Sequence, residues 1–157
     1  MGALAQTQAQ VAPAEPQSAA LAPQAQSGAE LPFRGSLDST ETATGSFPIV
    51  SVELHGTGHA THLGRFTATF LFQVDLSTSM GSGTFVLRAA NGDQVIGTET
   101  GQATVAGGVA SIVENAIITG GTGRFAGATG SFTIERAVVQ ATGVSSGSFT
   151  GTITLAH

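Results

Sequence analysis

One stretch of the sequence decides the fold: it reads RFTATFLFQV and covers residues 65–74. Apolar side chains such as Phe66, Phe70 and Phe72 occupy alternate positions, and polar ones such as Thr67 lie between them. An alternation with a period of two predicts a β-strand with one buried face and one solvent-exposed face.

The same alternation continues on both sides of this stretch and divides the chain into strand-like segments. These cover residues 33–42, 49–61, 64–75, 82–90, 93–105, 108–119, 130–140 and 146–155. Asn91-Gly92 predicts a hairpin, because a type I′ turn needs two residues that tolerate positive φ. Leu63-Gly64 and Gly107-Gly108 predict further tight connections. No segment longer than a turn has the period of a helix.

Eight sequential strands with short links predict an all-β domain, an antiparallel up-and-down barrel. Closure removes the exposed edges that an open sheet of this length would have to protect. The first and last segments share a pattern, FRGSL at 33–37 and FTGTI at 149–153, so we expect them to pair and close the barrel. Eight strands leave an interior that side chains fill or that holds one small ligand.

The composition excludes several classes of protein. The 157 residues contain five arginines and no lysine against ten carboxylates, so a basic surface for nucleic acid is not expected. The absence of cysteine excludes disulfides, a thiol nucleophile and zinc–thiolate sites. No apolar run approaches the length of about 18 residues that a transmembrane helix needs, so we expect no membrane span.

The first 31 residues differ from the rest, because they are rich in Ala, Gln and Pro. Such a segment buries too little apolar area to offset its ordering entropy, which predicts a flexible tail at 1–31 before a barrel domain at 32–157. Ala3-Leu4-Ala5 has the small-residue pattern at the end of a signal peptide, without the apolar run that would precede it. We therefore expect a secreted or periplasmic protein.

A dense motif, GGTGRFAGATG, covers residues 120–130. It resembles the signature shared by plant dirigent proteins and allene oxide cyclases, which are eight-stranded calycin-like barrels. A second stretch, GHATHLGRFT at 58–67, is similar to bacterial members of this superfamily whose function is not assigned. Physically, glycines permit a bulged turn, Phe125 can plug a barrel end and Arg124 can bond to loop carbonyls. No helix follows that could bind a pyrophosphate.

The resemblance implies a barrel for a small hydrophobic molecule, without a cofactor, that associates as a homo-dimer or trimer. Allene oxide cyclases close a reactive ion in an apolar barrel with the help of a carboxylate. Dirigent proteins steer the coupling of phenoxy radicals that they do not generate. The chain has no Tyr, Trp or Cys to match several expected pocket groups, so no catalytic residue of either family is carried over.

Strand parity places three charged residues on inward faces: Glu99, Glu114 and Arg136. An unpaired buried charge is costly, so we expect a Glu–Arg pair. Two carboxylates that share one arginine leave one of them with a raised pKa, suited to general acid or base catalysis. These three are the candidate catalytic residues. The alternative is a β-bulge that shifts the register and turns them to solvent.

Aromatic residues and one histidine are the candidate ligand-binding groups, and the alternative for the aromatics is a solid core. The phenylalanines are Phe66, Phe70, Phe72, Phe85, Phe132 and Phe149. His62 is expected either at a barrel mouth, near enough to a pocket to exchange a proton, or at a hairpin end. His55 and His59 alternate on one strand face about 13 Å apart, too far for one metal ion, so no metal site is expected.

Three functions remain open: a binding module for a small hydrophobic molecule, a cofactor-free cyclase or isomerase that uses Glu99 or Glu114, and a secreted structural or assembly protein. The interior discriminates among them. A cavity with an unpaired carboxylate favours the enzyme, a cavity without one favours the binding module, and a filled interior favours the structural role.

Overall fold

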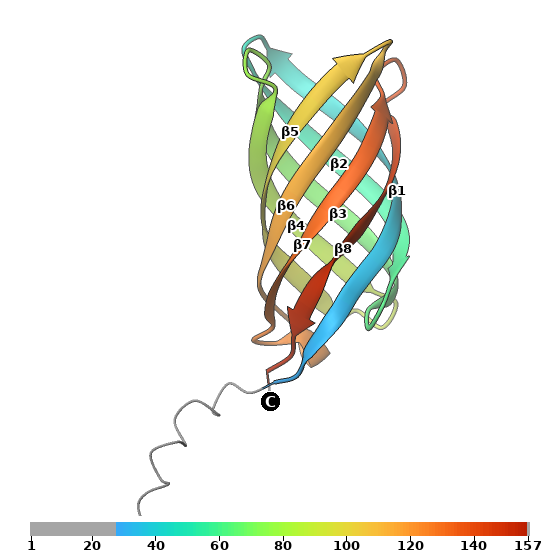
Figure 1. Cartoon of the computed structure of the whole chain (residues 1–157), viewed down its shortest axis with the longest axis vertical. Coiled ribbons are helices and arrows are strands. Elements are labelled where there is room, and N and C mark those ends of the chain that lie inside the picture. The colour runs from blue at the N-terminus through green and yellow to red at the C-terminus, as the bar shows by residue number, and fades with distance from the viewer. Residues whose placement is uncertain (1–27, 157) are drawn as a thin grey trace, which may run out of the picture.

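Eight antiparallel strands form a closed barrel in chain order in the computed structural model, which describes residues 28–156 (Figure 1). The strands are β1 (Glu30–Ser46), β2 (Ile49–Ala60), β3 (Gly64–Asp75), β4 (Met80–Ala89), β5 (Gln94–Ala106), β6 (Val109–Gly121), β7 (Thr129–Val139) and β8 (Val144–Thr154). The predicted all-β, up-and-down barrel is confirmed. The signal-like Ala3-Leu4-Ala5 and most of the predicted tail lie outside the described residues. Within 28–156, no helix is long and apolar enough to cross a membrane.

The first and last strands close the barrel, as their shared pattern predicts. β1 pairs with β8 so that Phe33 lies opposite Gly151 and Gly35 lies opposite Phe149. Every strand therefore has two hydrogen-bonded neighbours, and the sheet has no free edge.

Two predicted tight turns have different outcomes. Gly107 and Gly108 connect β5 to β6 with φ values of 62° and 79°, as a two-residue type I′ turn requires. The hairpin predicted at Asn91-Gly92 forms between β4 and β5, but its turn is not of type I′, because positive φ occurs at Gly92 and not at Asn91. The Asn91 side chain instead accepts a hydrogen bond from the Asp93 amide at 2.9 Å, a local bond that favours a longer loop.

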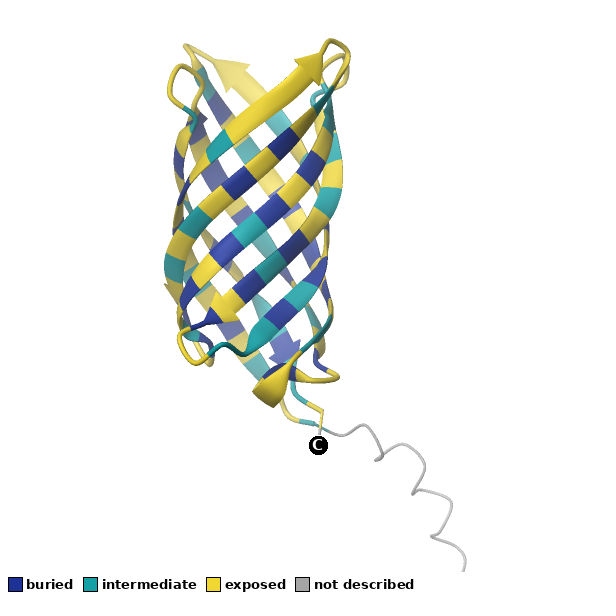
Figure 2. Cartoon of the chain, turned by 180° about the vertical axis from the view of Figure 1, so that it is seen from behind, coloured by how far each residue is buried: buried dark blue, intermediate teal, exposed yellow. Residues whose placement is uncertain are grey.

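The interior has two halves, which we call the closed half and the open half. Buried and exposed residues alternate along every strand (Figure 2). In the closed half, near the start of β1 and the end of β8, phenylalanine rings fill the barrel. Phe132 contacts Phe33, Phe85 and Phe149 with ring centroids 5.2, 5.5 and 5.1 Å apart. This aromatic cluster is part of the hydrophobic core, which also contains aliphatic side chains such as Leu54 and Ile134.

Glycines on neighbouring strands make room for these rings. Gly35 lies opposite Phe149, and Gly97 lies opposite Phe85. A Cβ atom added to either glycine would lie 2.7 Å from the facing ring. The rings therefore occupy the space that a side chain would take at each glycine.

The glycine-rich motif at residues 120–130 covers the end of the barrel in the closed half. Its one-turn 3₁₀ helix (Gly123–Phe125) holds Phe125 almost fully buried. Arg124 forms an ion pair with Asp93 at 2.9 Å and donates a hydrogen bond to the carbonyl of His62 at 3.3 Å. The motif thus has the plugging and loop-bonding roles that its residues predict.

Candidate functional site

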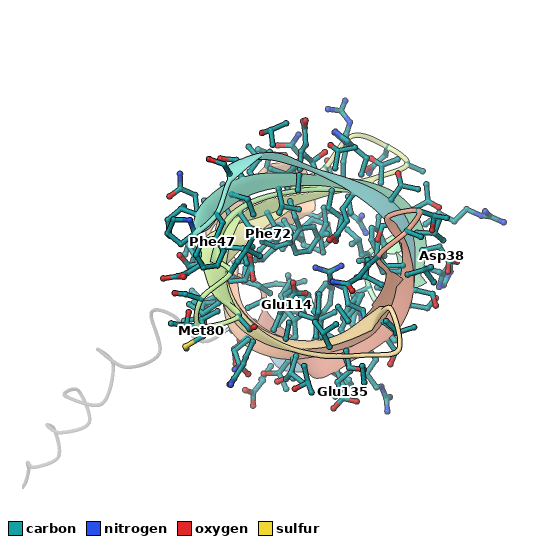
Figure 3. All side chains as sticks on the ribbon, turned by 90° about the horizontal axis from the view of Figure 1, so that it is seen from above. Asp38, Phe47, Phe72, Met80, Glu114 and Glu135 are labelled. Atoms are coloured by element: carbon teal, nitrogen blue, oxygen red, sulfur yellow. The ribbon has the colours of Figure 1, made fainter. Side chains whose placement is uncertain are left out.

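The open half contains a cavity of about 400 Å³ at the opposite end from the aromatic cluster. It opens between the β1–β2, β3–β4, β5–β6 and β7–β8 hairpins, which are uppermost in Figure 1. Much of the lining is apolar and includes Val50, Val74, Ala103, Val105, Ile112 and Val138. Seen from this end, Glu114 lies within the ring of strands, whereas Glu135 projects outside it (Figure 3).

A buried ion-pair cluster forms one wall of the cavity. From β7, Arg136 donates to both carboxylate oxygens of Glu114, at 3.1 Å from Nε and 2.9 Å from Nη2. Its Nη1 donates to Glu41 on β1 at 2.8 Å. Burial lowers the pKa of Arg136, but its bonds to the two carboxylates outweigh burial and raise that pKa overall. The guanidinium, which also lies 5.6 Å above the Phe72 ring, is therefore fixed and charged.

Glu99 on β5 is buried in the same cavity without such a partner. Its side chain is 3% exposed, and its Oε2 has no hydrogen-bond partner among the described residues. Burial, followed by the charge of Glu114, raises the pKa of Glu99 to about 8, although Arg136 acts in the opposite direction. At neutral pH, Glu99 is therefore mostly a neutral acid that can donate a proton.

Each of the three charged residues lies opposite a glycine on the neighbouring strand, as Phe85 and Phe149 do in the closed half. Glu99 lies opposite Gly83, Glu114 opposite Gly101 and Arg136 opposite Gly147. The register between β5 and β6 shifts once, between Ile96 and Gly97, and is regular from there to the open end. The bulge therefore lies before the charged residues and does not turn them to solvent.

The other sequence candidates lie in different places. All six candidate phenylalanines belong to the buried core, and among them Phe72 alone also lines the cavity. His62 is exposed with a φ of 65° in the β2–β3 turn at the closed end, a hairpin-end position away from the lining of the cavity. On the outer face, His55 lies 3.1 Å from Glu53, and residues 28–156 contain no cluster of three metal-ligating side chains.

Sequence reasoning missed three members of the polar cluster: Glu41, Ser39 and Ser145. Arg136 Nη1 lies 3.5 Å from the Ser145 hydroxyl, which in turn bonds to Ser39. A signal for them exists, because Ser39 and Glu41 continue the inward parity of Phe33 on β1. Ser145 lies on β8 one residue before the predicted start of that strand.

The closed barrel is similar in fold to a dirigent protein of known structure. The solved structure of the pterocarpan synthase dirigent protein GePTS1 matches it with a TM-score of 0.61, over 98% of this chain and 100% of that chain. The two sequences are 12% identical, so the similarity establishes the fold alone. The resemblance predicted from the glycine-rich motif is correct at this level. No family model matches the chain, and no curated protein matches it either.

Proposed function

We propose that this barrel binds a small, largely apolar molecule in the cavity of its open half. The observation that carries the proposal is the cavity itself. Its volume of about 400 Å³ falls within the range of about 300–1,000 Å³ that is typical of ligand sites. Apolar walls with a few converging polar groups are also typical of such sites.

A second candidate function is a cofactor-free cyclase or isomerase, and the unpartnered carboxyl of Glu99 favours it. A neutral acid in a sheltered cavity can donate a proton to an oxygen or nitrogen of the substrate and later take it back. Glu114 and Arg136 would set the electrostatic environment of Glu99 and would not exchange the proton themselves. The solved dirigent protein with this fold is a synthase, which supports an enzymatic use of the barrel.

The structural or assembly role has less support, because side chains fill only the closed half. Two parts of the proposal rest on the sequence. Secretion is inferred from Ala3-Leu4-Ala5, and association as a homo-dimer or trimer is inferred from the resemblance to dirigent proteins and allene oxide cyclases alone. Sedimentation velocity of the purified chain measures the assembly directly, and a monomer at all concentrations would remove that part.

Filling the cavity tests the binding function. We expect 1-adamantanol, a compact neutral molecule, to bind the wild-type protein, as measured by calorimetry. Ala103→Phe places a ring in the cavity, so affinity should fall by about tenfold or more, since a filled pocket loses its apolar burial. Ala137→Phe, on the exposed face of β7, is the matched control and should bind as the wild type does. Equal binding by both variants would overturn the proposal, as would a wild-type protein that binds neither this alcohol nor a charged molecule with the same hydrocarbon cage.

A further inference from the structure

The charges that line the cavity do not balance. Three carboxylates face it from three strands, Glu41 on β1, Glu99 on β5 and Glu114 on β6. One cationic side chain, Arg136 on β7, faces them, and no other lysine, arginine or histidine is among the described lining residues. When all four groups are ionised, the site has an excess of two negative charges.

Arg136 cannot supply the missing partner for Glu99. Its Nε and Nη2 bind Glu114, and its Nη1 binds Glu41 and approaches Ser145. Both partners are held on fixed strands, so a shift of the guanidinium toward Glu99 would break bonds that are already buried. Glu99 therefore lacks a hydrogen-bonding cation among the described residues, and its side chain lines the cavity.

Each class of ligand meets this site differently. An anion would be placed among three carboxylates and a guanidinium whose bonds are already made, which is unfavourable in a sheltered cavity. A neutral molecule would leave Glu99 as an unpartnered acid. An ammonium group would give the Glu99 carboxylate both an opposite charge and hydrogen-bond donors, the arrangement that a buried charge requires.

We propose that the ligand of this cavity is a compact apolar amine, bound as the ammonium ion against Glu99. The hydrocarbon part then lies against the apolar wall, which includes Val105, Ile112 and Val138. This inference rests on the proposed function, because it assigns the chemical class of the molecule that the cavity holds.

Binding of an ammonium ion has a proton balance that a neutral ligand lacks. Because burial raises the pKa of Glu99 to about 8, the carboxyl is mostly protonated at pH 6.5. The ammonium ion keeps its own protons, and the Glu99 proton goes to the solvent as the carboxylate–ammonium pair forms. The charged groups that face Glu99 are Glu41, Glu114 and Arg136. We expect the release of about one proton per amine at pH 6.5 and almost none at pH 9.

Three molecules with the same hydrocarbon cage test the inference: 1-adamantanamine, 1-adamantanol and 1-adamantanecarboxylate. Calorimetry at pH 8.5 should show the amine binding about tenfold or more tightly than the alcohol, a coupling typical of a sheltered charge pair, and the carboxylate not binding. Repeating the amine titration at pH 6.5 in buffers of different ionisation enthalpy measures the proton release.

Glu99→Gln should remove both the preference for the amine and the proton release, while the alcohol still binds. Glu135→Gln removes a carboxylate from the outer face of β7 and should leave both unchanged. If the alcohol binds the wild type as tightly as the amine, or Glu99→Gln keeps the preference, this inference is wrong and the binding function stands. If none of the three molecules binds, both fail.

Discussion

The closed and open halves of the barrel seat their large side chains in the same way but fill the space with different chemistry. In each half a large inward residue lies opposite a glycine, as Phe85 faces Gly97 and Arg136 faces Gly147. Rings fill the closed half, whereas charged groups and a cavity occupy the open half. One backbone pattern therefore supports both a core and a candidate site, and residue type alone separates the two halves.

The largest effect should come from emptying the closed half. Phe132→Ala removes a ring that contacts three others, so we expect it to lower the free energy of unfolding by about 4 kcal/mol, as is usual for buried aromatic residues. Phe72→Ala removes a ring that already borders the cavity, and about 2 kcal/mol is expected there. Urea denaturation measures both. Equal losses would show that the two halves do not differ in packing.

An intermediate effect should come from breaking the ion-pair cluster of the open half. Arg136→Met leaves Glu114 buried without its cation, which should lower the free energy of unfolding by about 3 kcal/mol at pH 7. Arg88→Met, on the exposed face of β4, is the control and should change stability by less than about 0.5 kcal/mol. Urea denaturation measures both variants, and equal losses would mean that the ion-pair cluster contributes no more than an exposed arginine does.

The smallest effect comes from replacing Glu99, the acid without a partner, and it should raise the free energy of unfolding instead of lowering it. Because the pKa of Glu99 is raised from 4.5 to about 8 on folding, the folded state holds a proton that the unfolded state has lost between these values. Wild-type stability should therefore fall as the pH rises from about 4.5 to 8, and the loss should persist above that range.

Glu99→Gln removes this dependence on pH. The free energy of unfolding of the variant should exceed that of the wild type by about 1.5 kcal/mol at pH 9 and should equal it near pH 4.5. The difference at pH 9 is smaller than the full pKa shift would give, because water can enter the mouth of the cavity. Thermal unfolding across pH 4–9 measures the difference. Glu114→Gln, which loses half of an ion pair, should instead be destabilised at neutral pH. A wild-type profile identical to that of Glu99→Gln would mean that Glu99 is solvated in the folded protein.

Most of the fold follows from the period-two pattern, because that pattern states which side chains point inward. Parity placed Glu99, Glu114 and Arg136 inside, and the same rule would have placed Glu41 there had it been applied along the whole of β1. Parity does not state the height of a residue along the barrel axis, which depends on strand tilt and stagger. For that reason Phe132 and Phe72 looked equivalent in the sequence, although one lies in the core and the other borders the cavity.

Because β1 pairs with β8, the start of the first strand lies next to the end of the last strand, and the eight strands form a closed ring. Glu30 and Thr154 are register partners, and antiparallel partners lie about 5 Å apart, so a short linker can join them. The ring can then be cut elsewhere, for example between Gly107 and Gly108, with all eight strand pairings retained. In the natural order the cut lies at the closed end, opposite the cavity. A surface or label attached through the C-terminal end of β8 therefore leaves the mouth of the barrel facing away from it.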